Sequence, residues 1–132
     1  MKAWDFTVTL PHTTGSLAQL GEQFGTAKIN IEGLAIFEQG NDVIAHVLVE
    51  NGEQARPVFE KGGYKVTSEC EVIVEHVDNR PGVLGIYARQ IADAGVNLTC
   101  AYIAMDGRLV LGAKDYSALA LAVRQVVTAA RS

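Results

Sequence analysis

The amino-acid sequence predicts an α+β fold in which antiparallel sheets carry helices on one face, built from a βαββαβ unit that occurs twice. The spacing of apolar residues changes from strand-like to helix-like in the same order in each half of the chain. The two halves also align with each other without gaps, and turn signals separate the predicted strands at matching places. Two copies of one unit are the economical explanation.

The internal repeat becomes visible when segment 15–43 is aligned with segment 82–110, at an offset of 67 residues. The identical pairs are Gly15/Gly82, Leu17/Leu84, Gln23/Gln90, Ala27/Ala94, Asn30/Asn97, Ile36/Ile103, Gly40/Gly107 and Val43/Val110. We therefore expect two domains, at residues 1–68 and 69–132.

The first copy predicts every element of the unit. Its first strand and first helix are indicated by the apolar positions Phe6, Val8 and Leu10, followed by Leu17, Leu20, Phe24 and Ala27. Segments 29–37 and 43–50 read as two strands joined by the turn QGND. Segment 51–63 predicts a short helix that ends at glycine, with Pro57 in its first turn or at a bend, and segment 64–69 predicts the closing strand.

The second copy predicts the same order without the last strand. Segment 70–77 is strand-like, and a helical stripe follows at Leu84, Tyr87, Ala88 and Ile91. Two further strands surround the turn signal Asp106-Gly107. Segment 115–132 predicts one helix, capped by Asp115 or Ser117, with the apolar stripe Leu119, Ala122, Val123 and Val126. The second unit therefore reads as βαββα.

The strand faces that point away from the helices are expected to be apolar and to pack between units, between two chains, or both. The residues assigned to these faces are Leu34, Ile36, Ile44 and Leu48 in the first unit and Ala101, Ile103 and Val110 in the second. The repeat pairs Phe6 with Ile73, but simple alternation favours Val72 and Val74 as core residues. A bulge near Glu75 would reconcile the two assignments.

Composition excludes several classes of function. The net charge of −4 and the pI near 5.3 argue against nucleic acid and against an anionic membrane as partners. Cys70 and Cys100 lack CxxC spacing and the three histidines lack ligand spacing, so we expect no metal, no cofactor and no disulfide. We see no signal peptide and no long apolar span, which favours the cytoplasm. No nucleophile with a neighbouring base is indicated, so we expect no enzyme.

The run NRPGVL (79–84) joins a predicted strand to a predicted helix. Pro81 suits a first helical turn, Asp78 or Asn79 can cap the helix, and Gly82 allows close approach to free backbone N–H groups. A carboxylate fits such a helix start, and the amides of Asn79 and Asn97 together could hold the ammonium and carboxylate of an amino acid. Helix capping and turn stabilisation alone also explain these residues.

The run DNRPGVLGIYARQIADAGVNL (78–98) resembles the start of an ACT domain, a regulatory module of amino-acid biosynthetic enzymes. With the repeat, the whole chain resembles a free-standing tandem ACT protein with ferredoxin-like units. The resemblance implies that an effector, usually an amino acid, binds at an interface between ACT units. It implies the ligand-binding residues Asn79, Arg80, Pro81, Gly82, Val83, Leu84, Asn97 and Leu98, and in the first unit His12, Thr14, Gly15, Ser16, Leu17, Asn30 and Ile31.

Two features separate this chain from the ACT pattern. Serine-binding members carry a histidine where this sequence has Val77, which argues against serine, and the first unit has His12 and Thr14 in place of the second unit's Asn79 and Pro81. We expect an amino-acid sensor, with a homodimer and possible docking on a metabolic enzyme. The alternative is a protein-interaction subunit whose ligand site has decayed. An RNA-binding domain of the same topology is disfavoured, because basic and aromatic runs are absent from the sequence.

Overall fold

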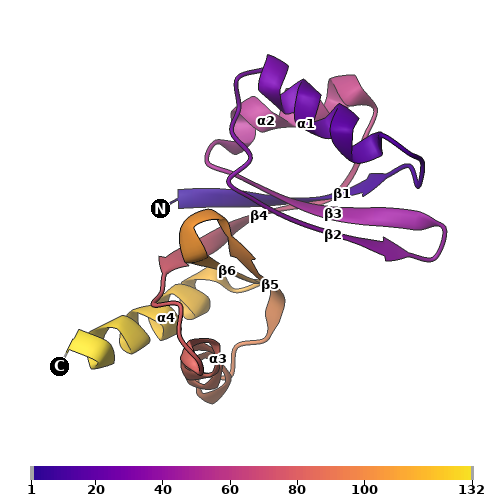
Figure 1. The fold of residues 1–132 in the computed structure, drawn as a ribbon. Coiled ribbons are helices and arrows are strands. Elements are labelled where there is room, and N and C mark those ends of the chain that lie inside the picture. Colours follow the sequence, from indigo (N-terminus) through magenta and orange to yellow (C-terminus); the bar gives the residue numbers. More distant parts are fainter. Residues whose placement is uncertain (1, 132) are drawn as a thin grey trace. The chain divides into compact units, whose positions relative to one another are not determined.

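The fold is described by a computed structural model, with the backbone of residues 2–131 and the side chains of residues 2–127. The elements are β1 (Lys2–Leu10), α1 (Ser16–Thr26), β2 (Gly33–Gln39), β3 (Asp42–Val49), α2 (Gly52–Gly62), β4 (Lys65–His76), α3 (Val83–Asp93), β5 (Leu98–Ala104), η1 (Met105–Gly107), β6 (Arg108–Ala113) and α4 (Tyr116–Arg131). The chain forms two compact units, Lys2–Glu71 and residues from Val72 onward, and each has α+β architecture (Figure 1).

In the first unit the strand order is β2-β3-β1-β4, with β2 at the edge. The pairs β1/β3 and β2/β3 are antiparallel, and α1 and α2 lie on one face of the strands (Figure 1). This is the ferredoxin-like arrangement that the βαββαβ order predicts. It forms because each strand places alternate residues on the helix side, where they become buried.

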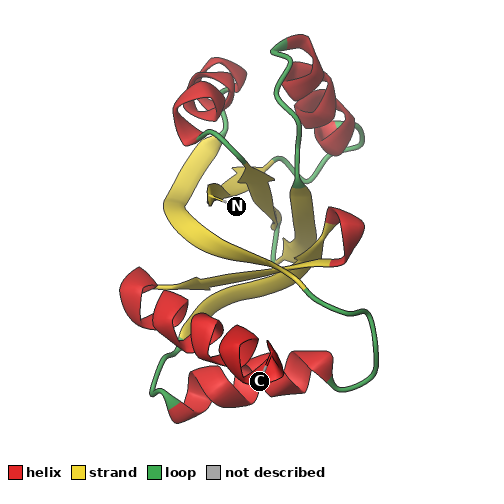
Figure 2. Cartoon of the chain, turned by 90° about the vertical axis from the view of Figure 1, so that its left-hand side faces the viewer, coloured by secondary structure: helices red, strands yellow, loops and turns green. Residues whose placement is uncertain are grey.

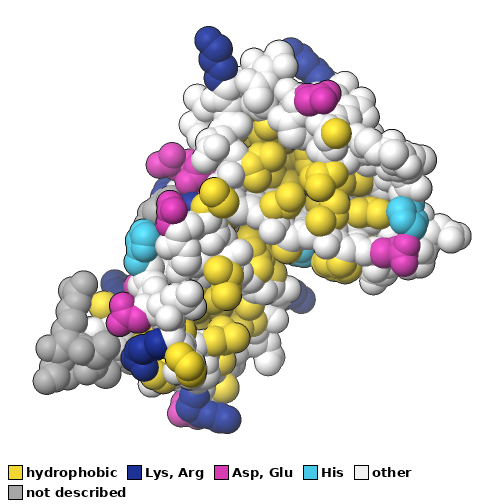
Figure 3. Space-filling view, in the orientation of Figure 1, with side chains coloured by type: hydrophobic (Ala, Val, Ile, Leu, Met, Phe, Trp, Pro, Cys, Tyr) yellow, Lys and Arg dark blue, Asp and Glu magenta, His cyan; other side chains and the backbone are white. Residues whose placement is uncertain are grey.

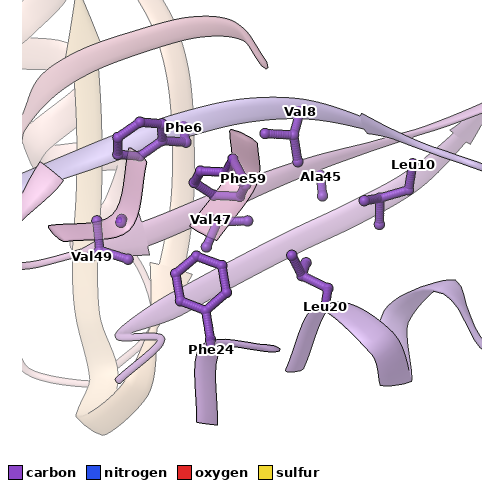
Figure 4. Packing of buried hydrophobic residues seen from close by; sticks show 10 residues of the cluster. Phe6, Val8, Leu10, Leu20, Phe24, Ala45, Val47, Val49 and Phe59 are labelled. Atoms are coloured by element: carbon purple, nitrogen blue, oxygen red, sulfur yellow. The ribbon is translucent and has the colours of Figure 1, made fainter. Parts of the chain in front are cut away.

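The core of the first unit is centred on three phenylalanines (Figure 4). The ring centroid of Phe59 from α2 lies 4.9 Å from that of Phe6 and 5.1 Å from that of Phe24. Aliphatic side chains from β1, β3 and α1 surround them: Val8, Leu10, Leu20, Ala45, Val47 and Val49. The predicted stripe of α1 is therefore correct for Leu20 and Phe24, whereas Leu17 and Ala27 are exposed.

In the second unit the strand order is β4-β6-β5, with β5 at the edge, and α3 and α4 lie on one face. Its core combines Tyr87 and Ile91 of α3 with Leu109, Leu111 and Ala113 of β6 and the full predicted stripe of α4, Leu119, Ala122, Val123 and Val126. Within residues 2–131 no strand follows α4, so the second unit has the predicted βαββα order.

Strand β4 is a single twelve-residue strand, Lys65–His76. It joins the closing strand predicted for the first unit to the opening strand predicted for the second. Its first half neighbours β1, where the Thr67 hydroxyl donates to the Thr7 carbonyl at 3.1 Å. Its second half pairs with β6. No Gly or Pro interrupts residues 65–76, which explains why the strand continues.

In each unit the long helices lie on one side of the strands (Figure 2). Several strand residues lie on a different side from the one predicted. Leu34 and Ile36 stand opposite Val47 and Ala45, which are core residues on the helix side, so both belong to that side. Ala101 and Ile103 stand opposite Leu111 and Leu109 and likewise lie on the helix side. The assignments of Ile44, Leu48 and Val110 to the other face are correct. Strongly apolar edge strands carry no polar face, so alternation could not reveal their orientation.

The register question at β4 is also answered. Ile73 packs on the helix-side core, as the repeat predicts from Phe6, and Val72 and Val74 lie on the other face. The pairing of β4 with β6 runs from Ile73↔Leu111 to His76↔Arg108 without a shift, so the expected bulge near Glu75 is absent there. The irregular pairing lies instead between Leu98 and Cys100 in β5.

Helix ends follow local chemistry. The Asn51 side chain accepts a hydrogen bond from the Gln54 N–H at 3.2 Å to begin α2, and Gly63 ends it with a φ of 73°. Pro57 lies in the middle of α2 rather than in its first turn. The Asp115 carboxylate accepts from the Ala118 N–H at 3.0 Å, which confirms the predicted cap of α4. Among the described helices, none is both long and apolar enough to cross a membrane.

The aromatic core of the first unit yields a stability prediction. We expect Phe59→Ala to reduce the free energy of unfolding by about 3–5 kcal/mol, because it removes a fully buried ring from between two others. Phe37→Ala is the matched control, since 49% of Phe37 is exposed, and it should cost about 1 kcal/mol or less. Urea titrations followed by circular dichroism measure both. Equal losses would contradict this description of the core.

Candidate functional site

The candidate site is built on two matching turns, which follow β1 and β4. In the first, the Ser16 hydroxyl donates to the Pro11 carbonyl at 2.7 Å and the Ser16 N–H donates to the Thr13 carbonyl at 3.3 Å. In the second, the Arg80 N–H donates to the Asp78 carbonyl at 2.9 Å. These bonds hold each turn in place just before its helix begins.

A glycine with left-handed backbone conformation precedes the helix in both turns. Gly15 has φ 92° and ψ −3°, and Gly82 has φ 90° and ψ −11°. A β-carbon at either position would meet no atom within 4 Å, so the requirement for glycine comes from the backbone angle and not from crowding. The repeat therefore preserves one specific backbone shape.

The expected capping in NRPGVL is wrong in detail. The residue preceding α3 is Gly82 rather than Asp78 or Asn79, and neither this helix nor α1 has a side-chain cap. Pro81 lies in the turn before Gly82 and not in the first helical turn. Asn79, Arg80, Pro81 and Gly82 are all exposed. Their side chains are therefore accessible.

The electrostatic surroundings of the second turn are partly acidic. Burial, with smaller contributions from the negative charges of Glu75 and Asp78, raises the pKa of Tyr87 above its usual value. The phenol of this core residue therefore stays neutral at physiological pH. Arg80, an exposed residue, supplies a positive charge within the turn itself.

A hollow of about 470 Å³ lies beside the first turn. It is lined by Leu10, Pro11, His12, Thr13, Gly15, Ser16, Leu17, Ala18, Ile36 and Val43. In Figure 3, hydrophobic side chains gather on this face of the first unit between α1 and the edge strand β2. The structure therefore brings four of the predicted site residues, His12, Gly15, Ser16 and Leu17, together with an apolar strand residue, Ile36.

The polar side of this hollow is formed by His12. Its Nε2 lies 3.0 Å from the Glu38 carboxylate at the end of β2, and both side chains are largely exposed. Ser16 is engaged with backbone carbonyls. His12 and Glu38 thus place a histidine–carboxylate contact beside the hollow.

An exposed leucine and an exposed isoleucine recur in both units. Leu17 is 45% and Leu84 is 52% exposed, although the next residue of each helical stripe, Leu20 or Tyr87, is buried. On the edge strands, Ile36 is 38% and Ile103 is 69% exposed. Sequence reasoning did not assign the two isoleucines to the site, although they are one of the identical pairs of the repeat. The identity of Ile36 and Ile103 in the repeat alignment is the feature of the sequence that could have assigned them to the site.

The two asparagines that the repeat aligns, Asn30 and Asn97, do not meet the turn of their own unit. Leu10, which ends β1, pairs with Val43, and Val43 pairs with Glu38 near the end of β2. The start of β2 pairs at the far end of β3, where Gly33 faces Leu48. Five residues of β3 separate these positions, a distance of about 17 Å at about 3.3 Å per residue. The expectation that Asn79 and Asn97 share one site within a unit is wrong for the same reason, since His76 pairs with Arg108 and Leu98 pairs with Ala113.

The remaining predicted residues have separate surroundings. Asn30 donates from its amide to the Glu32 carboxylate, and Ile31 packs against the first core. Val83 and Leu98 pack against the second core. Thr14 and Asn97 are exposed. Within one unit, Asn30, Ile31, Asn97 and Leu98 lie at or before the start of the edge strand and form no site together with the turns.

Comparisons with known proteins concern the fold. No protein-family model matches the sequence, and no curated protein sequence matches it either. Among solved structures, a protein from Bacteroides thetaiotaomicron is similar with a TM-score of 0.81 and 20% identity, over 95% of this chain and 88% of that one. The ligand-free regulatory subunit of aspartate kinase from Thermus thermophilus is similar with a TM-score of 0.65 and 16% identity, over 95% and 91%.

A third similar structure is the aspartate kinase of Clostridium acetobutylicum, described as an allosteric enzyme, with a TM-score of 0.59 and 12% identity. The match covers 95% of this chain and 33% of that one. At these identities the likeness establishes the fold. The chain therefore shares the α+β fold of these structures, made of two ferredoxin-like units.

The left-handed turns yield a second stability prediction. We expect Gly82→Ala to reduce the free energy of unfolding by about 1–2 kcal/mol, because alanine is strained at a φ of 90°. Gly85→Ala is the matched control: Gly85 lies inside α3, has open space around a β-carbon, and should gain about 0.5–1 kcal/mol. Chemical denaturation measures both changes. A neutral Gly82→Ala would contradict the proposed role of the backbone angle.

Proposed function

We propose that this protein is a non-catalytic regulatory protein that binds an amino acid at an interface between ACT-like units of two copies of the chain. The observation that carries the proposal is the repeated constellation of a left-handed glycine turn, an exposed leucine and an apolar edge strand. Its likeness in fold to the regulatory subunit of an aspartate kinase supports a regulatory role.

Two copies are needed because of the strand register. In each unit the turn lies near the end of an edge strand, β2 or β5, and the asparagine lies before its start. When two edge strands pair antiparallel, the end of one strand lies beside the start of the other. Such pairing would place the turn of one copy next to the asparagine of the second.

The surface of the edge strands favours this pairing. Exposed apolar side chains lie along both edges: Ile36 and Phe37 on β2, and Ile103 on β5 with Met105 directly after it. An unpaired strand edge with such residues is normally covered by another chain or blocked by charge. Pairing would satisfy its backbone groups and bury these side chains.

An amino acid matches the chemistry of the turn. The N–H groups at the start of a helix favour a carboxylate. The amide oxygen of Asn79, or of Asn97 from the second copy, can accept from an ammonium group. Leu84 and Ile103, both exposed, offer an apolar surface to the side chain of the ligand. His12 and Asn30 would play the matching roles in the first unit.

A protein-interaction subunit is the second candidate function. The same exposed apolar residues favour it, because an edge strand can equally receive a strand from a metabolic enzyme. In that case the chain would bind its partner without requiring an amino acid. The two candidates differ in their response to free ligand.

Ligand binding is tested by measuring the melting temperature with each of the twenty amino acids at millimolar concentration. We expect at least one to raise it, because a ligand at about 100 times its Kd stabilises the folded state by about 2.7 kcal/mol. Asn79→Ala and Asn97→Ala should each weaken this response, and Asn41→Ala, in the exposed turn between β2 and β3, should leave it unchanged. No response to any amino acid would favour the interaction subunit.

Self-association is tested by sedimentation velocity. We expect the wild type to sediment as a dimer, and the double variant Ile36→Lys with Ile103→Lys to sediment as a monomer, because a lysine on an edge strand opposes strand pairing. Leu121→Lys is the matched control on an exposed position of α4, with 54% of the residue accessible. A dimer that survives the double variant would contradict pairing through these edges.

A further inference from the structure

A second hollow lies on the helix side of the first unit, between α1 and α2, and contains none of the residues of the turns. Its volume is about 880 Å³, which is within the range of small-molecule sites. It is lined by Gln19, Glu22, Gln23, Thr26, Ala27, Lys28 and Ile29 on one side and by Gln54, Pro57, Val58, Lys61 and Gly62 on the other. The lining thus combines polar side chains with apolar ones.

The second unit provides an internal comparison for this groove. At the repeat position of Gln23, the Gln90 amide of α3 donates to the Gln125 side chain of α4 at 2.9 Å and bridges the two helices. In the first unit the Gln23 oxygen is enclosed and accepts no hydrogen bond from any described residue. The two units therefore differ at an otherwise identical residue, and the difference lies at the groove.

Lys28 is a second, independent observation that points to a ligand in the groove. It follows α1 with a φ of 59°, and its N–H donates to the Gly25 carbonyl at 3.1 Å in a left-handed helix end. The second unit has the same helix end, with the Gly95 N–H donating to the Ala92 carbonyl at 2.9 Å, but uses glycine at a φ of 76°. Glycine is the usual residue there because a side chain is strained in this conformation.

The fold alone does not explain why a lysine occupies a position that suits glycine. Strained residues of this kind are concentrated at binding sites. Lys28 lines the groove together with Lys61 from the last turn of α2, and Glu22 is the only acidic residue in the lining. Two cations against one carboxylate give the groove an excess of positive charge, although the chain as a whole carries −4.

We propose that the α1–α2 groove binds a small anion-bearing metabolite, with Lys28 and Lys61 contacting its carboxylate or phosphate and the glutamines Gln19, Gln23 and Gln54 contacting its polar groups. This site is separate from the interface proposed for the amino acid. It would give the first unit a ligand that the second unit, which has Gly95 in place of Lys28, does not bind.

The floor of the groove is narrow at Gly62. A β-carbon there would lie 2.9 Å from the Gln23 oxygen and would also collide with the Tyr64 ring. Burial raises the pKa of Tyr64, whose hydroxyl is enclosed as well. Gly62 thus leaves room for Gln23, which lines the groove, and for the Tyr64 ring, and a larger residue would displace both.

The test uses the full chain and two probes, inorganic phosphate and succinate, each titrated at constant ionic strength with sodium chloride. Backbone amide shifts in ¹⁵N–¹H spectra report where each anion binds. We expect saturable shifts at Gln23, Lys28 and Lys61 with at least one probe. Saturation with phosphate alone or succinate alone would assign the anionic group. Absence of saturable shifts at the groove with both probes would overturn the proposal.

Lys28→Gly is the decisive variant because stability and binding should change in opposite directions. Without anion its melting temperature should equal or exceed that of the wild type, since glycine relieves the strain, and its affinity for the probe should fall at least about fivefold. Lys61→Gln should weaken binding similarly. Lys114→Ala, an exposed lysine of the second unit, should leave affinity unchanged. A lower melting temperature for Lys28→Gly, or an equal loss of affinity in Lys114→Ala, would contradict the proposal.

Discussion

The antiparallel register of the strands in each unit is the constraint on which the account of the site depends. Because Val43 pairs with both Leu10 and Glu38, the turn after the first strand must lie near the end of the edge strand. The asparagine before that edge strand must then lie at the other end of the sheet. No rotation of a side chain can cover this separation of about 17 Å. A ligand that contacts both elements therefore requires a second unit beside the first, and the proposed function follows from that requirement.

Because the unit occurs twice, the two copies within one chain can be compared residue by residue. Three features occur in both copies and therefore characterise the repeated unit. They are the left-handed Gly15 and Gly82, the exposed Leu17 and Leu84, and the edge residues Ile36 and Ile103. Features that differ are candidates for specialisation. Lys28 against Gly95 and the unbonded Gln23 against the bridging Gln90 both occur on the helix side of the first unit. The copies thus agree at the proposed amino-acid site and differ at the proposed anion site.

Much of the fold could be predicted because it depends on local periodicity. The alternation of Phe6, Val8 and Leu10 and the stripe of α4 correspond directly to buried positions. The faces of β2 and β5 could not be predicted in the same way, since apolar residues occur at successive positions there and either orientation buries them. The helix start at Gly82 was also misplaced, because Asn79 and Pro81 both have strong local preferences for helix starts. The backbone angle of Gly82 became evident only from the structure.

The geometry around the predicted site residues could not be derived from the sequence. Several residues of the first turn do surround one hollow, while the distance between each turn and its asparagine depends on pairing between strands that are remote in sequence. Periodicity within a single segment contains no information on such pairing. Lys28 could not be assigned a role from the sequence either. A lysine in a surface loop becomes unusual only when its positive φ is known.

The most direct test of the central claim mixes two inactive chains. One carries His12→Ala and Asn79→Ala, so that both turns are disabled, and the other carries Asn30→Ala and Asn97→Ala. If each site combines the turn of one copy with the asparagine of another, subunit exchange should restore about a quarter of the wild-type binding of the amino acid, measured by calorimetry, because half of the dimers are mixed and half of their sites are intact. Wild-type binding without any recovery in the mixture would contradict the account.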